Sequence, residues 1–232
     1  MPTKLIRVSP SIIAIDYNND EVLTTALENI ERAGANFVHV DVMDGKFVKN
    51  KTFDHKFVDK LRDKTSLLLD VHLMVENPDE VVEKYIKAGA DIISVHFEAC
   101  KNITETLKKI KENNVVSGVA ISPRTSPLKI KDLLETGLVD VVLVMGVKPG
   151  AYGQKFIPGM AEKIAEIREM DKKVFIEIDG GVTIKNSKIL RKMGVNIIVS
   201  GKTIFESKNM KKTIKQLKGG GIFTKLASYF KN

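Results

Sequence analysis

The fold is decided by one stretch of sequence, Phe37-Val-His39-Val-Asp41-Val-Met43, which is followed by Asp44-Gly45. Its β-branched and aromatic residues show no helical spacing, so we predict a strand that ends at the Asp-Gly turn. Side chains alternate between the two faces of a strand. An imidazole, a carboxylate and a thioether are therefore expected to share one face, opposite a face of three valines.

The same alternation of apolar strand and helix recurs along the whole chain. We predict strands over 8–14, 37–43, 67–74, 92–96, 115–121, 139–144, 174–179 and 196–200, and helices over 18–33, 56–61, 78–87, 104–112, 129–134, 158–170, 186–193 and 209–218. The strands are mostly continuous apolar runs, which is typical of parallel strands covered on both faces. Eight strand-helix units in 232 residues favour a single α/β domain, a (β/α)8 TIM barrel, over an open doubly wound sheet.

Composition limits the class of protein. The chain is 43% hydrophobic and has no apolar run of membrane-spanning length, and residues 1–8 lack the pattern of a secretory signal. We therefore expect a cytoplasmic protein with no membrane partner. The single cysteine, Cys100, excludes an internal disulfide and a zinc site made of thiolates.

The net charge is +8, from 37 Lys and Arg against 29 Asp and Glu. The lysines are scattered along the predicted helices, and no basic motif interleaved with aromatic residues appears. We expect an anionic substrate or a merely lysine-rich composition, and no nucleic-acid partner. A basic RNA-binding protein is the alternative, and it would show salt-sensitive affinity for nucleic acid.

Polar side chains stand at the ends of several predicted strands. Asp70-Val-His72-Leu-Met74 repeats the alternation of the first stretch, and Asp179 ends another strand before Gly180-Gly181. The carboxyl ends of barrel strands meet at one face. We therefore expect His39, Asp41, His72 and Asp179 to converge as a nitrogen and oxygen set suited to Zn²⁺, Fe²⁺, Mn²⁺ or Co²⁺. The alternative is structural: aspartates that cap loops and histidines that bond core carbonyls.

Three glycine-rich loops follow the later strands: residues 146–154, Asp179-Gly180-Gly181 and Ser200-Gly201-Lys202. Glycine lets backbone amides approach an oxyanion closely, and barrels often hold phosphate after strands seven and eight. Lys202 adds a positive charge. Each loop by itself is also compatible with a tight turn. Together they predict a phosphate site.

The chain resembles the ribulose-phosphate 3-epimerase family. The matching segments are Ser9-Pro-Ser11-Ile12, residues 39–48, Asp70-Val-His72-Leu-Met74-Val75, His96-Phe-Glu98, residues 144–150, Gly153-Gln154-Lys-Phe156 and Ile178-Asp179-Gly180-Gly181. The resemblance implies a homo-oligomeric, metal-dependent epimerase that interconverts D-ribulose 5-phosphate and D-xylulose 5-phosphate. It implies that Asp41 and Asp179 are catalytic, and that His39, Asp41, His72 and Asp179 bind one divalent ion (zinc, iron, manganese or cobalt). It places the substrate at Ser11, His72, Met43, Met74, Met145, Gly150, Ala151, Tyr152, Gly153, Gly180, Gly181, Gly201 and Lys202.

The chemistry of epimerisation agrees with this set. Inverting a carbinol carbon beside a ketone requires removal of a proton from one face and return of a proton to the other. Asp41 and Asp179 can provide this 1,1-proton transfer, and a metal would stabilise the enediolate between the two steps. Methionine thioethers can keep water off the reacting carbon without protonating it. His96 and Glu98 are expected to orient the ligands or to line the pocket.

Several positions depart from the family pattern. Lys49 replaces the usual proline, Ala151-Tyr152 replaces Phe-Gly in a glycine loop, residues 122–126 replace an Asn-Pro-x-Thr-Pro segment, and Lys202 replaces a serine. These changes affect the sugar and phosphate ends of the site, not the metal set. A D-allulose 6-phosphate 3-epimerase and a non-catalytic phosphosugar-binding barrel therefore remain as alternatives.

The sequence also predicts a boundary near the carboxyl end. Gly219-Gly-Gly221 is expected to separate a barrel domain, 1–218, from a linker and short amphipathic tail, 219–232. We expect the tail to pack on the barrel or on a neighbouring subunit, and to be dispensable for activity.

Overall fold

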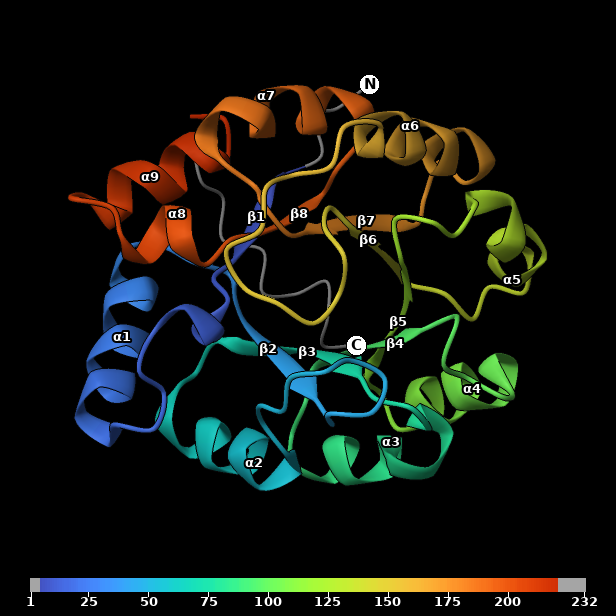
Figure 1. Ribbon diagram of the computed structural model, residues 1–232, viewed down its shortest axis with the longest axis horizontal. Coiled ribbons are helices and arrows are strands. Elements are labelled where there is room, and N and C mark those ends of the chain that lie inside the picture. The colour runs from blue at the N-terminus through green and yellow to red at the C-terminus, as the bar shows by residue number, and fades with distance from the viewer. Residues whose placement is uncertain (1–4, 221–232) are drawn as a thin grey trace.

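Eight parallel strands surrounded by helices make up the computed structural model, which describes residues 5–220 (Figure 1). The strands are β1 (Arg7–Ser9), β2 (Phe37–Met43), β3 (Leu68–Met74), β4 (Ile92–His96), β5 (Val116–Ile121), β6 (Val141–Met145), β7 (Phe175–Asp179) and β8 (Ile197–Val199). The helices are α1 (Asp20–Arg32), α2 (His55–Lys64), α3 (Pro78–Lys87), α4 (Ile103–Glu112), α5 (Lys131–Glu135), α6 (Met160–Met170), α7 (Ile184–Met193), α8 (Lys202–Phe205) and α9 (Met210–Leu217), with 3₁₀ turns at Ile12–Ala14 and Pro127–Ile130.

The sheet closes into a barrel. The strands are hydrogen-bonded in the order β1-β8-β7-β6-β5-β4-β3-β2. The remaining gap, between β1 and β2, is closed by a bridge between Ser11 and His39, and the His39 amide donates to the Pro10 carbonyl at 3.0 Å. The predicted (β/α)8 barrel is confirmed, and the open doubly wound sheet is excluded.

The alternation of side chains separates two environments. Val38, Val40 and Val42 lie on the outer face of β2 and are 0–1% exposed in the core beneath the helices. The inner face carries polar groups, and the register pairs His39 with Asp70 and Asp41 with His72 on β3. Burying apolar area on the outer face stabilises the barrel at about 25 cal/mol per Å². Because the outer face supplies the apolar core, the inner face can present polar side chains for ligand binding or catalysis at the carboxyl ends of the strands.

Local sequence signals set several helix starts. The Asn19 side chain accepts from two amides of the first turn of α1, and Asp54 accepts from the Phe57 amide at the start of α2. Pro78 occupies the first turn of α3, where its missing N–H costs no hydrogen bond. Helix α3 has the bounds predicted from the sequence.

Most predicted boundaries lie within three residues of the observed ones, and three differences are larger or change the kind of element. The first strand was expected over 8–14, but it ends at Ser9, because Pro10 has no N–H to continue the ladder and residues Ile12–Ala14 form a 3₁₀ turn. The helix expected over 129–134 begins as a 3₁₀ turn at Pro127 and becomes α5. The short helix α8 was not predicted, because four residues are too few to show a period.

No helix among residues 5–220 is long and apolar enough to cross a membrane. The predicted tail lies almost entirely at 221–232, outside the described residues. Its boundary, the homo-oligomer and the cytoplasmic location stay predictions.

Candidate active site

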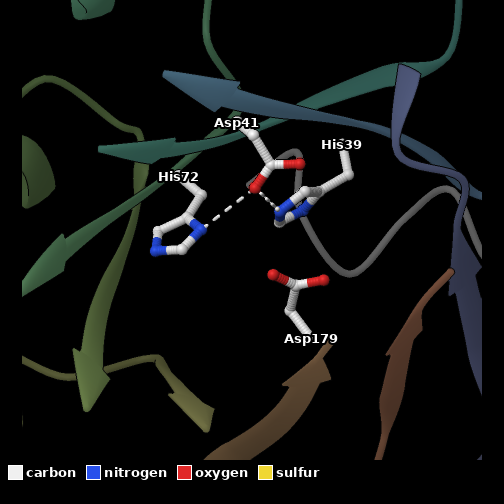
Figure 2. A group of neighbouring side chains, drawn as sticks. All are labelled: His39, Asp41, His72 and Asp179. Carbon is white, nitrogen blue, oxygen red and sulfur yellow. Dashed lines mark hydrogen bonds and ion pairs between the residues drawn. The ribbon is translucent and has the colours of Figure 1, made fainter. Parts of the chain in front are cut away.

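Four side chains converge at the carboxyl end of the barrel (Figure 2). His39 and Asp41 come from β2, His72 comes from β3, and Asp179 approaches from β7 on the opposite side. Each offers one nitrogen or oxygen, and these four atoms all lie within 4.8 Å of one another. The convergence expected from the sequence is present, so the arrangement has the donors of a small metal site.

His39 is held by a carboxylate behind it. Its Nδ1 lies 2.7 Å from Asp70 Oδ2, an oxygen that also accepts from the Ser9 hydroxyl at 2.8 Å. Its Nε2 faces the cluster, 3.4 Å from Asp41 Oδ1, and has no hydrogen-bond partner among residues 5–220. Burial acts to lower the pKa of His39, but Asp70 and Asp41 raise it well above its usual value. A divalent cation can take the place of the Nε2 proton, as in other carboxylate-histidine-metal arrangements.

Asp41 is the centre of the cluster. Its Oδ2 accepts from the Ser11 hydroxyl at 2.6 Å, and its Oδ1 lies 3.4 Å from both His39 Nε2 and His72 Nδ1. Burial acts to raise its pKa, but the two histidines lower it well below the usual range. Asp41 is therefore an ionised carboxylate with one oxygen fixed by a hydroxyl and the other directed at the cluster.

Asp179 behaves differently from Asp41. Burial and then the negative charge of Asp41 raise the pKa of Asp179 to about 7. Two carboxyl groups whose pKa values are pushed apart are suited to act as one base and one acid. The set of two imidazole nitrogens and two carboxylate oxygens also fits a divalent transition ion, although no single element is selected by these donors.

A line of hydrogen bonds leads away from His72. His72 Nε2 lies 2.9 Å from His96 Nε2, and His96 Nδ1 lies 3.0 Å from Glu98 Oε2. Burial acts to raise the pKa of Glu98, but hydrogen bonds from His96 and Thr125 lower it to about 2. Glu98 therefore contacts His96, which contacts His72, and it does not line the cavity described next, so of the two expected roles only the orienting one stays a prediction.

Replacing Glu98 by glutamine should change how stability depends on pH. A carboxylate whose pKa falls from 4.5 to about 2 on folding stabilises the protein above its unfolded pKa, and this contribution is lost as the pH falls toward 2. The free energy of unfolding of the natural protein should therefore exceed that of Glu98→Gln most at neutral pH. Urea denaturation of both proteins between about pH 6 and about pH 3 measures the difference. A difference that stays constant over this range would contradict the assignment.

A cavity of about 1000 Å³ opens above the cluster. Asp41 and Asp179 line its floor, and His72, which is fully buried, does not line it. The other predicted substrate residues all line it: Ser11, Met43, Met74, Met145, Gly150, Ala151, Tyr152, Gly153, Gly180, Gly181, Gly201 and Lys202. The three methionines are at most 3% exposed and form an apolar wall beside the two carboxylates.

The glycine loops around the cavity are tightly packed. The loop between β6 and α6 extends over the end of the barrel toward β2 (Figure 1), where the Asn50 side chain donates to the Gly150 carbonyl at 2.7 Å. A Cβ on Gly150 would lie 2.6 Å from Val48 Cβ, and one on Gly181 would lie 2.4 Å from the Phe156 amide nitrogen. The Val48 side chain at Gly150 and the Phe156 backbone at Gly181 leave no room for a Cβ, and both residues have a positive φ, so both positions favour glycine.

Replacing Gly181 by alanine should lower the free energy of unfolding by more than the positive φ of this residue alone predicts. Gly181 has φ +66°, and Gly137 has a similar φ of +70°, but in the described part of the chain no atom lies within 4 Å of a Cβ added to Gly137. Gly137→Ala should cost about 1 kcal/mol for the left-handed backbone. Gly181→Ala should cost at least about 1 to 3 kcal/mol more because the Phe156 segment must move. Denaturant unfolding of the two variants tests this, and equal losses would contradict it.

Two groups of residues at the site were not predicted. Ser9 and Glu177 face the barrel interior beneath the cluster, where Glu177 Oε1 lies 3.7 Å from His39 Nδ1. Burial and the Asp70 charge raise the pKa of Glu177 well above its usual value. The signal for Glu177 was its position two residues before Asp179 on the same strand face. The second group consists of three cavity-lining lysines besides Lys202: Lys148, Lys155 and Lys185.

A closed parallel barrel with a buried histidine-carboxylate cluster beneath a lysine-lined cavity defines a (β/α)8-barrel protein with a candidate metal centre. The model of the "Ribulose-phosphate 3 epimerase family" matches residues 7–205. The chain belongs to this family and is an isomerase.

Relatives from this family align with nearly the whole chain. The ribulose-phosphate 3-epimerase of Bacillus subtilis is 39% identical over 220 residues, which cover 93% of this chain and 99% of that protein. The chloroplastic ribulose-5-phosphate-3-epimerase of Arabidopsis thaliana is 42% identical over 219 residues, 92% of this chain and 76% of that protein.

Solved structures with low sequence identity share the fold. The 3-hexulose-6-phosphate synthase of Salmonella typhimurium has a TM-score of 0.67 at 14% identity, covering 92% of this chain and 97% of that one. The 3-keto-L-gulonate-6-phosphate decarboxylase of Vibrio cholerae has a TM-score of 0.67 at 14% identity, covering 93% and 96%. These likenesses support the barrel architecture.

Proposed function

We propose that the chain interconverts D-ribulose 5-phosphate and D-xylulose 5-phosphate by proton transfer through Asp41 and Asp179. The observation that carries the proposal is the placement of these two carboxyl groups on opposite sides of one centre, at the floor of the cavity (Figure 2). A sugar carbon between them has an acid/base group on each face, which is what inversion of a carbinol centre requires.

The surrounding residues have separate tasks. The Ser11 hydroxyl holds one oxygen of Asp41, so the other oxygen keeps its direction toward the centre. Met43, Met74 and Met145 exclude water from the reacting carbon without offering a proton. The glycine loops and the lysines at the cavity bind the phosphate group through backbone amides and positive charge.

The cluster would hold one divalent ion through His39, Asp41, His72 and Asp179. When bound, the ion supplies positive charge that lowers the energy of the enediolate by several kcal/mol. Zinc, iron, manganese and cobalt all suit the donors.

Two other functions would use parts of the same site, namely epimerisation of a hexulose phosphate and binding of a phosphosugar without catalysis. D-Allulose 6-phosphate is a second candidate substrate, because a cavity of about 1000 Å³ accommodates one further carbinol unit and the loop at Ala151-Tyr152 departs from the family pattern. A non-catalytic phosphosugar-binding barrel would use the glycine loops but has no use for two carboxyl groups facing one another.

The test is a turnover assay of the metal-loaded protein with each sugar phosphate. We expect D-ribulose 5-phosphate to be converted with a kcat/KM well above that of D-allulose 6-phosphate. The reverse order would transfer the proposal to the hexulose. Binding of both sugars without turnover of either would identify the non-catalytic barrel.

A further inference from the structure

Three side chains in line, Glu98, His96 and His72, connect the loop after β5 with the candidate metal centre, and Glu98, at the outer end, keeps 26% of its side chain exposed. His72 and His96 are 0% exposed, and their Nε2 atoms are 2.9 Å apart. Two ring nitrogens at this distance hold one hydrogen between them, since two lone pairs or two N–H groups would repel. The position of that hydrogen decides which nitrogen of His72 can bind a cation.

Glu98 settles the position of the hydrogen. Its Oε1 accepts from the Ser122 amide at 2.8 Å and from the Thr125 hydroxyl, and its Oε2 lies 3.0 Å from His96 Nδ1. A carboxylate with these partners accepts from His96 Nδ1–H. A neutral His96 then carries its lone pair on Nε2, so the hydrogen between the rings belongs to His72 Nε2.

We propose that Glu98, through His96, fixes the proton of neutral His72 on Nε2 and so directs the lone pair of His72 Nδ1 at the metal centre. His72 Nδ1 lies 3.4 Å from Asp41 Oδ1, at the long end of hydrogen-bond distances, whereas His72 Nε2 lies 2.9 Å from His96 Nε2, so the shorter contact is the one that holds the proton of His72. Two acceptors that face each other are brought into favourable contact by a cation between them. Glu98 and His96 are therefore positioning residues, and the inference rests on the proposed metal site.

The loop that holds Glu98 is itself fixed. The Lys163 ammonium group on α6 is buried and lies 3.0, 2.9 and 2.6 Å from the carbonyl oxygens of Ser122, Pro123 and Thr125. This clamp keeps the Ser122 N–H directed at Glu98. The orientation of Glu98 is thus set by the Ser122 N–H, a backbone group that can donate a hydrogen bond but cannot accept one.

The variant Glu98→Gln tests the proposal without changing side-chain shape. Because the Ser122 N–H can only donate, the amide oxygen must occupy the Oε1 position, and the amide nitrogen must then face His96 Nδ1. His96 Nδ1 becomes the acceptor, the hydrogen moves to His96 Nε2, and His72 carries its proton on Nδ1, directed at the centre. The tautomers of both histidines are therefore expected to be exchanged.

The readout is ¹⁵N NMR of the four histidines in the metal-free protein. The natural protein should show His72 protonated on Nε2 and His96 on Nδ1, and Glu98→Gln should show both reversed. The Kd for Co²⁺ should rise about 10- to 100-fold in Glu98→Gln. The control Glu83→Gln, an exposed residue on α3, should keep the natural tautomers and the natural Kd.

Three results would overturn the proposal: His72 protonated on Nδ1 in the natural protein, natural tautomers in Glu98→Gln, or an unchanged Kd for Co²⁺ in that variant. The first readout needs no variant, so a folding defect of Glu98→Gln does not remove the test. It also needs neither metal nor substrate. Absence of epimerase activity in the natural protein would contradict the proposed function and leave the tautomer result as it stands.

Discussion

Replacement of Asp179 by asparagine is expected to lower kcat for epimerisation by at least about 10³-fold, and Asp41→Asn should do the same. Each variant keeps the size of the side chain but removes an acid/base group from one side of the centre. Inversion needs both groups, so one remaining carboxylate cannot compensate for the other. Steady-state kinetics with D-ribulose 5-phosphate measure the effect.

The matched control for these variants is Asp132→Asn, which removes a carboxylate from the exposed surface of α5. It should retain the natural kcat and KM. The two site variants should keep the fold, because Asp41 and Asp179 lie at strand ends beside a cavity and not in the apolar layer beneath the helices. Natural turnover in either variant would remove that residue from the mechanism.

Removal of divalent metal by a chelator is expected to reduce turnover by at least about 100-fold, which corresponds to a loss of about 2.7 kcal/mol of transition-state stabilisation. Added Co²⁺ or Zn²⁺ should restore turnover and should raise the Tm, because a ligand that binds the folded state stabilises it. In His39→Asn, the same concentration of metal should neither restore turnover nor raise the Tm. The reason is the loss of the Nε2 donor that faces Asp41.

Turnover and Tm values that do not respond to metal would contradict the metal site. A chelated protein with full turnover, and with the same Tm before and after addition of metal, would show that the four side chains work without an ion. Recovery by Mg²⁺ alone would indicate an oxygen-rich site, which a cluster with two imidazole donors does not fit.

The sequence predicted those features that depend on local pattern. The alternation along residues 37–43 predicted both the bounds of β2 and the face that each side chain occupies, because a strand has a period of two residues. The Asn77-Pro78 pair predicted the start of α3. The barrel then followed from eight repeats, and with it the convergence of groups at the carboxyl ends of the strands.

Features that depend on the pairing of distant strands could not be predicted in the same way. The contact between His72 and His96 depends on the register of β3 with β4, and no local pattern specifies it. The cavity lysines come from the loop between β6 and α6 and from the first turns of α7 and α8, whose approach is set by the closed barrel. Pro10 was visible in the sequence, but the bridge from Ser11 to β2, which directs the chain after Pro10 across the gap between β1 and β2, was not.

In the proposed reaction, Asp41 and Asp179 exchange protons with opposite faces of one sugar carbon. Conversion of D-ribulose 5-phosphate in D₂O by the Co²⁺-loaded protein, with deuterium in the product located by mass spectrometry and NMR, shows whether this exchange takes place. We expect one solvent deuterium at carbon 3 of every D-xylulose 5-phosphate molecule formed. Product that carries no deuterium at carbon 3 would contradict it.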